Sequence, residues 1–81
     1  MRVTITNTGY TQINTNADEY LVQNITSGDI YVIIADTQPA DNAKFDFRLH
    51  PNDGISNNDV AGLVWAKSAL FDSAEISVVE G

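Results

Sequence analysis

The only histidine of the chain, His50, is the first residue to consider for catalytic chemistry. General-base catalysis by histidine needs a positioned partner, such as a serine or cysteine nucleophile held within hydrogen-bonding reach. His50 stands directly before Pro51, and no such nucleophile pattern surrounds it. We therefore predict a half-exposed turn histidine, with a pH-sensitive interface contact as the alternative.

A run of oxygen-bearing side chains extends from Asn52 to Asp59 and contains the residue types that hold Ca²⁺. The run does not have EF-hand spacing, because no bidentate glutamate closes it. Asn, Asp and Gly are also the residues from which turns are built. We predict a turn with no metal and no cofactor, and cation binding by this loop stays an open alternative.

Neighbouring carboxylates occur at Asp18 with Glu19 and at Asp72 with Glu75. Glycoside hydrolysis needs two carboxylates that face each other across a cleft, and a domain of this size rarely has a deep one. Neither a P-loop nor a dinucleotide-binding glycine pattern occurs. We predict solvated acidic rims and a protein that is not an enzyme.

The aromatic residues could form a face that binds sugar or peptide. The candidates are Tyr10, Tyr20, Tyr31, Trp65 and Phe71. Aromatic side chains on strands more often pack in a core or in a subunit interface. The residues that we predict at an interface between subunits are Val3, Ile5, Tyr10, Trp65 and Phe71.

The size and charge of the chain limit its partners. Eighty-one residues make one domain with a thin margin of stability, and the absence of cysteine excludes disulfides and thiol chemistry. Oligomerisation is the remaining way to stabilise so small a domain. A net charge of −7 repels phosphate and anionic lipid, so we expect neither nucleic acid nor a membrane as a partner. No apolar leader or long apolar span occurs, so we expect neither secretion through a signal peptide nor membrane crossing.

Short runs of alternating apolar and polar residues, separated by Gly, Pro, Asn and Asp, predict strands along most of the chain. The runs lie at residues 2–6, 19–25, 30–35, 44–49 and 74–80. The run 30–35 is almost continuously apolar, which suits a strand covered on both faces. In the run 44–49, the alternation places Phe45, Phe47 and Leu49 on one face.

Two segments are ambiguous. Residues 60–71 fit either a helix or a strand, and the alternation around Val64 and Trp65 favours a strand. Residues 7–18 are rich in Thr and Asn, which favour turns, so we expect an edge strand or an extended arm. On this view, deletion of residues 1–16 leaves the fold intact and weakens partner binding.

The predicted fold is all-β: a small antiparallel β-sandwich or jelly-roll-like barrel of about six to seven short strands. No confident helix interrupts the strands, which disfavours a parallel sheet with crossover helices. The chain forms a single domain overall, with an N-terminal strand or arm at residues 1–18 and the sandwich at residues 19–81.

Several phrases of the sequence resemble small virion structural proteins of tailed bacteriophages. They include Phe47–Gly54, with its arginine-leucine-x-proline-x-x-glycine pattern, and Val64–Ser68 followed by the alternating run Ala74–Glu80. Further phrases lie at Tyr20–Asn24, Ile30–Val32 and Asp36–Pro39. The resemblance covers about residues 20–81 and leaves residues 2–16 without a counterpart.

This resemblance implies a β-sandwich that binds other virion subunits, most readily a capsid decoration or cement protein. Its partner would be the major capsid protein, and it would be a homo-oligomer, with a trimer favoured. It would belong to the virion and be assembled in the host cytoplasm. The alternatives are a head-fibre or tail-component β domain, or a carbohydrate-binding module that uses Trp65, Tyr10 and the acidic loops.

Overall fold

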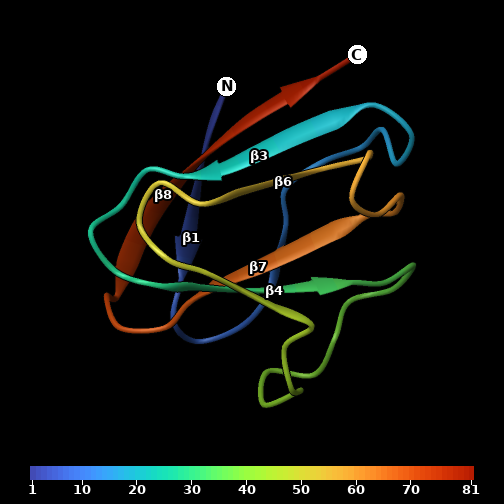
Figure 1. Cartoon of the computed structure of the whole chain (residues 1–81). Coiled ribbons are helices and arrows are strands. Elements are labelled where there is room, and N and C mark those ends of the chain that lie inside the picture. The colour runs from blue at the N-terminus through green and yellow to red at the C-terminus, as the bar shows by residue number, and fades with distance from the viewer.

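The computed structural model describes all 81 residues and contains eight strands (Figure 1). The strands are β1 (Arg2–Thr6), β2 (Thr11–Gln12), β3 (Tyr20–Asn24), β4 (Ile30–Ile34), β5 (Phe47–Leu49), β6 (Gly54–Ser56), β7 (Val64–Ser68) and β8 (Ser73–Glu80). No helix of the chain is long and apolar enough to cross a membrane. The expectation of an all-β chain is confirmed.

The strands form two four-stranded antiparallel sheets that pack face to face. The first sheet has the order β1-β8-β3-β6, and the second has the order β2-β7-β4-β5. The pairs β1–β8, β2–β7, β3–β6 and β4–β5 therefore alternate between the sheets, as in one long hairpin ribbon rolled upon itself. This is the jelly-roll arrangement. The predicted antiparallel sandwich is confirmed.

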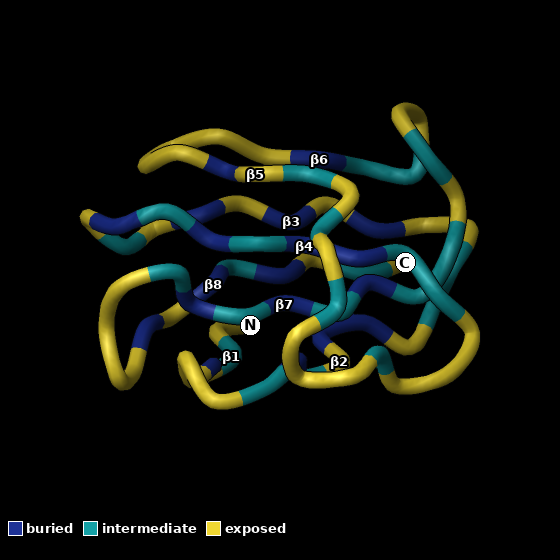
Figure 2. Tube along the Cα trace, turned by 90° about the horizontal axis from the view of Figure 1, so that it is seen from below, coloured by how far each residue is buried: buried dark blue, intermediate teal, exposed yellow.

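The core lies between the two sheets and contains a cluster of 13 buried residues (Figure 2). β8 contributes Ala74, Ile76 and Val78, each at most 6% exposed, as its alternation predicts. The ambiguous segment 60–71 contains β7, whose inward side chains include Val64 and Ala66. The strand prediction for that segment is confirmed, because an inward face of period two fills the space between the sheets.

The N-terminal segment is part of the sandwich and is not a peripheral arm. β1 pairs with β8 along its whole length, and Ile5 is completely buried. Asn14 accepts a hydrogen bond from the Val64 amide at 2.6 Å and donates one to the Gly62 carbonyl at 3.1 Å. Removal of residues 1–16 would take away a paired strand and a core residue, so we now expect it to disrupt the fold, contrary to the expectation from composition. Polar Asn and Thr residues here satisfy the backbone of a neighbouring strand, which composition alone does not reveal.

Two further expectations need correction. The side chains of Phe47 and Leu49 pack against the core, but the ring of Phe45 stacks on Tyr31 outside it, with ring centroids 4.4 Å apart. The alternation fails because the Asp46 amide donates to the Val32 carbonyl, so the chain bends before β5 begins. β6 lies within the stretch that the sequence predicts as a polar turn. The prediction misses this strand because only one of its three residues, Ile55, is apolar.

Candidate functional site

The outer face of the first sheet is open to solvent and carries few charged side chains. We call it the open face; its outward side chains are Arg2, Thr4, Thr6, Leu21, Gln23, Gly54, Ser56, Ser73, Glu75, Ser77 and Val79. Its only charged residues, Arg2 and Glu75, pair with each other at 3.7 Å. In a chain with eleven acidic residues, this face therefore carries no net charge.

An apolar pair lies on the open face. Leu21 of β3 and Val79 of β8 are directly opposite in the register, and they are 51% and 57% exposed. Isolated exposed apolar residues are common on protein surfaces, but two that are paired across neighbouring strands form a contiguous patch. This patch is the strongest feature for contact with another protein.

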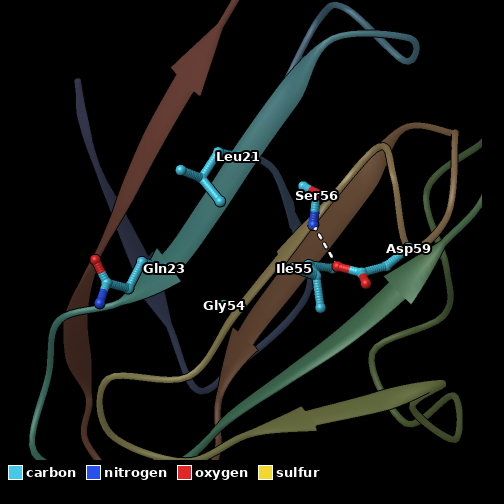
Figure 3. Close-up of a pocket in the computed structure, with 6 residues that line it drawn as sticks. All are labelled: Leu21, Gln23, Gly54, Ile55, Ser56 and Asp59. Carbon is cyan, nitrogen blue, oxygen red and sulfur yellow. Dashed lines mark hydrogen bonds between the residues drawn. The ribbon is translucent and has the colours of Figure 1, made fainter.

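A shallow hollow of about 300 Å³ adjoins the pair, between β3 and β6 (Figure 3). Leu21 and Gln23 line one side of it, Gly54, Ile55 and Ser56 line the other, and the carboxylate of Asp59 completes the lining. Gly54 has a structural reason to be glycine, because a Cβ there would lie 2.8 Å from the carbonyl oxygen of Val22. The hollow thus places the apolar side chain of Leu21 beside polar groups, and a single carboxylate, Asp59, does not make a set of catalytic groups.

The outer face of the second sheet is covered by the loop between β4 and β5, which lies on the side away from the first sheet (Figure 1). We call it the covered face. The Tyr10 hydroxyl donates to the Ala43 carbonyl at 2.9 Å, and the Gln38 side-chain amide donates back to the Tyr10 carbonyl at 3.0 Å. Ile33 is only 8% exposed although it points away from the core. β4 is thus covered on both faces, as predicted, and its outer cover is the chain's own loop.

Two more side chains fasten this loop to β7. The Trp65 indole N–H donates to the Ala35 carbonyl at 2.9 Å. The Lys67 ammonium donates to the Asp41 carbonyl at 2.6 Å and lies 4.8 Å from the centroid of the Tyr10 ring. These contacts hold the loop against the outer side of β7, where Trp65 and Lys67 are half-buried.

His50 lies in a surface cluster with Asp29 and Arg48 at the end of the second sheet. Asp29 accepts hydrogen bonds from Arg48 Nε at 2.7 Å and is 2.9 Å from His50 Nδ1. The hydrogen bonds from His50 and then from Arg48 lower the pKa of the Asp29 carboxyl. The imidazole is 63% exposed, which agrees with a turn histidine. The cluster can orient the ring, but no nucleophile within it completes a catalytic set.

The carboxylates of the loop 52–59 are engaged with their own backbone. Asp53 accepts from the His50 amide at 3.0 Å, and Asp59 accepts from the Ser56 amide at 2.9 Å. Asn52 adopts a left-handed conformation with φ of 72°, which Asn tolerates in turns. This is the turn chemistry that the sequence predicts. No group of three or more His, Asp or Glu side chains is arranged to hold a metal ion.

The residues predicted at an interface are not gathered on one surface. Ile5 and Tyr10 are buried within the single subunit, so their side chains have no surface for a partner. Val3 packs partly against the core, and Trp65 belongs to the covered face. Phe71 is 38% exposed in the turn before β8, beside Gly28. The burial of Tyr10 also removes one of the two residues named for carbohydrate binding.

Sequence reasoning missed the residues that make the open face apolar. Leu21 stands between the inward residues Tyr20 and Val22, and Val79 follows the inward residue Val78. An apolar residue out of phase with an alternating strand is the signal that could have found both. Asp29 was missed because its partners are 19 and 21 residues away in the sequence.

Comparison with protein-family models, with curated proteins and with solved structures finds no match for this chain.

Proposed function

We propose that this protein is a non-enzymatic structural subunit of a tailed-phage virion, a decoration or cement protein that binds the major capsid protein through its open face. The observation that carries the proposal is the exposed Leu21–Val79 pair on a sheet face whose only charged strand residues, Arg2 and Glu75, pair with each other. The virion assignment comes from the sequence phrases, and the open face supplies the surface that such binding needs.

Charge supports this choice of face. Protein interfaces are depleted of charged residues at their centres, and a partner avoids the cost of removing water from unpaired carboxylates. The acidic residues lie mainly in loops and at strand ends, such as Asp18, Glu19, Asp36 and Asp72. Such a molecule can bind a partner through its open face. Its acidic residues then stay in contact with solvent and maintain solubility.

The expected interface of one copy is small, because the face is only four short strands wide. Many copies on one lattice compensate for a weak single contact when each capsid offers repeated sites. A decoration protein can therefore rely on a shallow surface of this kind. A head-fibre or tail-component domain would use a similar face on another virion subunit.

Co-sedimentation with expanded, empty capsids tests the proposal. The capsids are assembled from the major capsid protein encoded in the same genome. We expect the wild-type protein to sediment with them, and the double variant Leu21→Gln with Val79→Gln to bind at least about tenfold more weakly. The matched control is Leu70→Gln, because Leu70 is 68% exposed but lies outside the open face.

Failure of the wild-type protein to bind capsids would overturn the proposal. Equal binding by the double variant and by Leu70→Gln would show that another surface binds. Binding of the isolated protein to a glycan array would instead favour the carbohydrate-binding alternative.

A further inference from the structure

β1 is the longest open edge of either sheet. The sheets have four edge strands: β1 with five residues, β5 and β6 with three each, and β2 with two. β6 is closed at Ser56, because its outward amide donates to Asp59 and its carbonyl accepts from the amides of Asp59 and Val60. β1 contains no Pro, Lys or bulge of the kind that protects edge strands from pairing.

The register shows which backbone groups of β1 are unpaired. Val78 donates its amide hydrogen to the Met1 carbonyl at 2.7 Å, which marks Met1 and Val78 as a hydrogen-bonded pair. Bonded pairs alternate in an antiparallel ladder, so Val3 and Ile5 are the next residues to bond β8. The N–H and C=O groups of Arg2, Thr4 and Thr6 therefore point away from the sheet.

We propose that β1 pairs with β1 of a second copy of this chain, antiparallel and about a two-fold axis at Thr4. In this register Thr4 faces Thr4 of the second copy, and Arg2 faces Thr6 of the second copy. All three outward residues of each strand then bond, with up to about six hydrogen bonds between the chains. The two open faces become one continuous face of eight strands.

Side-chain types fit this register on both sides of the sheet. On the open face, Thr–Thr pairs across antiparallel strands are favourable. On the core side, Val3 and Ile5 of the second copy are opposite in the register; the Ile5 side chain is already buried in its own subunit, so only the partly buried Val3 can gain cover there. An isologous contact requires such self-complementarity, because each residue must accept its partner under the two-fold axis.

Charge also fits this edge better than other parts of the molecule. β1 carries one cation and no carboxylate. In this register Arg2 lies opposite Thr6 of the second copy. Within that copy, Thr6 pairs with Ser73, which follows Asp72 in the sequence. The net charge of −7 on each chain opposes association at long range, so physiological salt, which shortens the Debye length to about 8 Å, assists it.

The size of the contact predicts a weak dimer. Five residues from each strand give an interface below about 1,200 Å², which is the range of transient complexes. We therefore test self-association by sedimentation equilibrium of the full chain at protein concentrations from about 10 μM to 1 mM. The expected result is a monomer–dimer equilibrium. A monomer throughout, or a trimer, overturns the proposal.

The self-paired position allows a sharp test of the register. Thr4→Lys and Thr4→Asp each place two like charges opposite one another, and we expect each to weaken the dimer at least about fivefold. An equimolar mixture of the two variants places opposite charges together, and we expect it to dimerise again as a heterodimer. The control Gln12→Lys adds charge at the edge of the second sheet and leaves dimerisation unchanged.

Thr4→Pro gives a second, independent variant. Its N–H points away from β8, and an edge strand tolerates proline where the missing N–H faces solvent. We expect a folded monomer, with folding checked by circular dichroism. An undiminished dimer in the Lys, Asp or Pro variants, or no recovery in the mixture, would show that β1 is not the interface. The proposal does not depend on capsid binding, so either result leaves the capsid test independent.

Discussion

The outer faces of the two sheets differ in how the chain treats them. The covered face carries Ile33 and Trp65; Ile33 is buried, and Trp65 is half-buried and hydrogen-bonded to the loop between β4 and β5. The open face carries Leu21 and Val79, which no segment of the chain covers, since both are more than half exposed. The chain thus has a loop able to cover apolar side chains and uses it on one sheet only. This difference suggests that exposure of Leu21 and Val79 has a purpose other than folding.

The largest expected effect on stability comes from replacing Asn24. Its side chain lies in the core and connects β3 of the first sheet to β5 of the second. Its completely buried amide donates to the carbonyls of Gly28 and Leu49 at 2.8 and 2.9 Å, and its oxygen accepts from the Thr26 amide at 2.9 Å. Asn24→Leu leaves these three groups without partners, and we expect it to lower the free energy of unfolding by about 3 kcal/mol or more.

Urea unfolding followed by the fluorescence of Trp65 measures this loss. Gln23→Leu on the same strand is the control, because Gln23 is exposed on the open face. A loss for Asn24→Leu that is no greater than that of the control would mean that the sheets are held together without this amide.

The next effect tests whether the covered face contributes to stability. Trp65→Ala removes the indole packing and its hydrogen bond to Ala35, and releases the start of the loop. We expect a loss of about 2–3 kcal/mol, below the range for a fully buried tryptophan because Trp65 is half-buried. Thermal unfolding by circular dichroism measures it.

Tyr10→Phe tests the covered face with a smaller change than Trp65→Ala. It keeps the ring and removes only the hydroxyl that donates to Ala43, so about 1 kcal/mol is expected. If neither variant lowers stability, the loop does not act as a cover and the contrast between the two faces fails.

A smaller expected effect is a loss of stability at low pH. Hydrogen bonds from His50 and Arg48 lower the pKa of Asp29 below its ordinary value of 3.8. The stabilisation that Asp29 provides is therefore complete above that ordinary pKa and is lost as the pH falls through the lowered one. Backbone amides of Asn16 and Thr15 lower the pKa of Glu80 in the same direction.

We expect the melting temperature to fall on acidification below about pH 4, and Asp29→Asn to reduce the steepness of that fall. The comparison variant is Asp36→Asn, whose side chain makes no hydrogen bond or ion pair. Identical acid profiles for Asp29→Asn and the wild-type protein would mean that the cluster does not stabilise the fold.

The smallest expected effect on stability belongs to the open face. Replacement of Leu21 and Val79 by Ser should change the free energy of unfolding by less than about 0.5 kcal/mol for each, because both side chains are largely exposed in the folded subunit. Chemical denaturation of the single and double variants measures this. A large loss would show that the pair serves the fold of one subunit and is not reserved for a partner.

Much of the fold follows from local alternation. Residues 2–6 and 74–80 were predicted as strands because their apolar residues recur at every second position, and they form β1 and β8. β6 was not predicted, since a three-residue strand with one apolar side chain has no measurable period. The candidate site was least predictable, because Leu21 and Val79 are 58 residues apart and only the register brings them together.

The sequence by itself determined the fold class, the strand faces and the charge, because each depends on residue types and spacings along the chain. The tertiary structure decided which sheet the loop covers, how the N-terminal strand enters the core, and where Asp29 meets His50. These features depend on contacts between distant segments, and a period-two pattern does not specify which strand lies beside which. The open face therefore results from the topology. Its only sign in the sequence is that Leu21 and Val79 are apolar at positions where the alternation of their strands predicts polar residues.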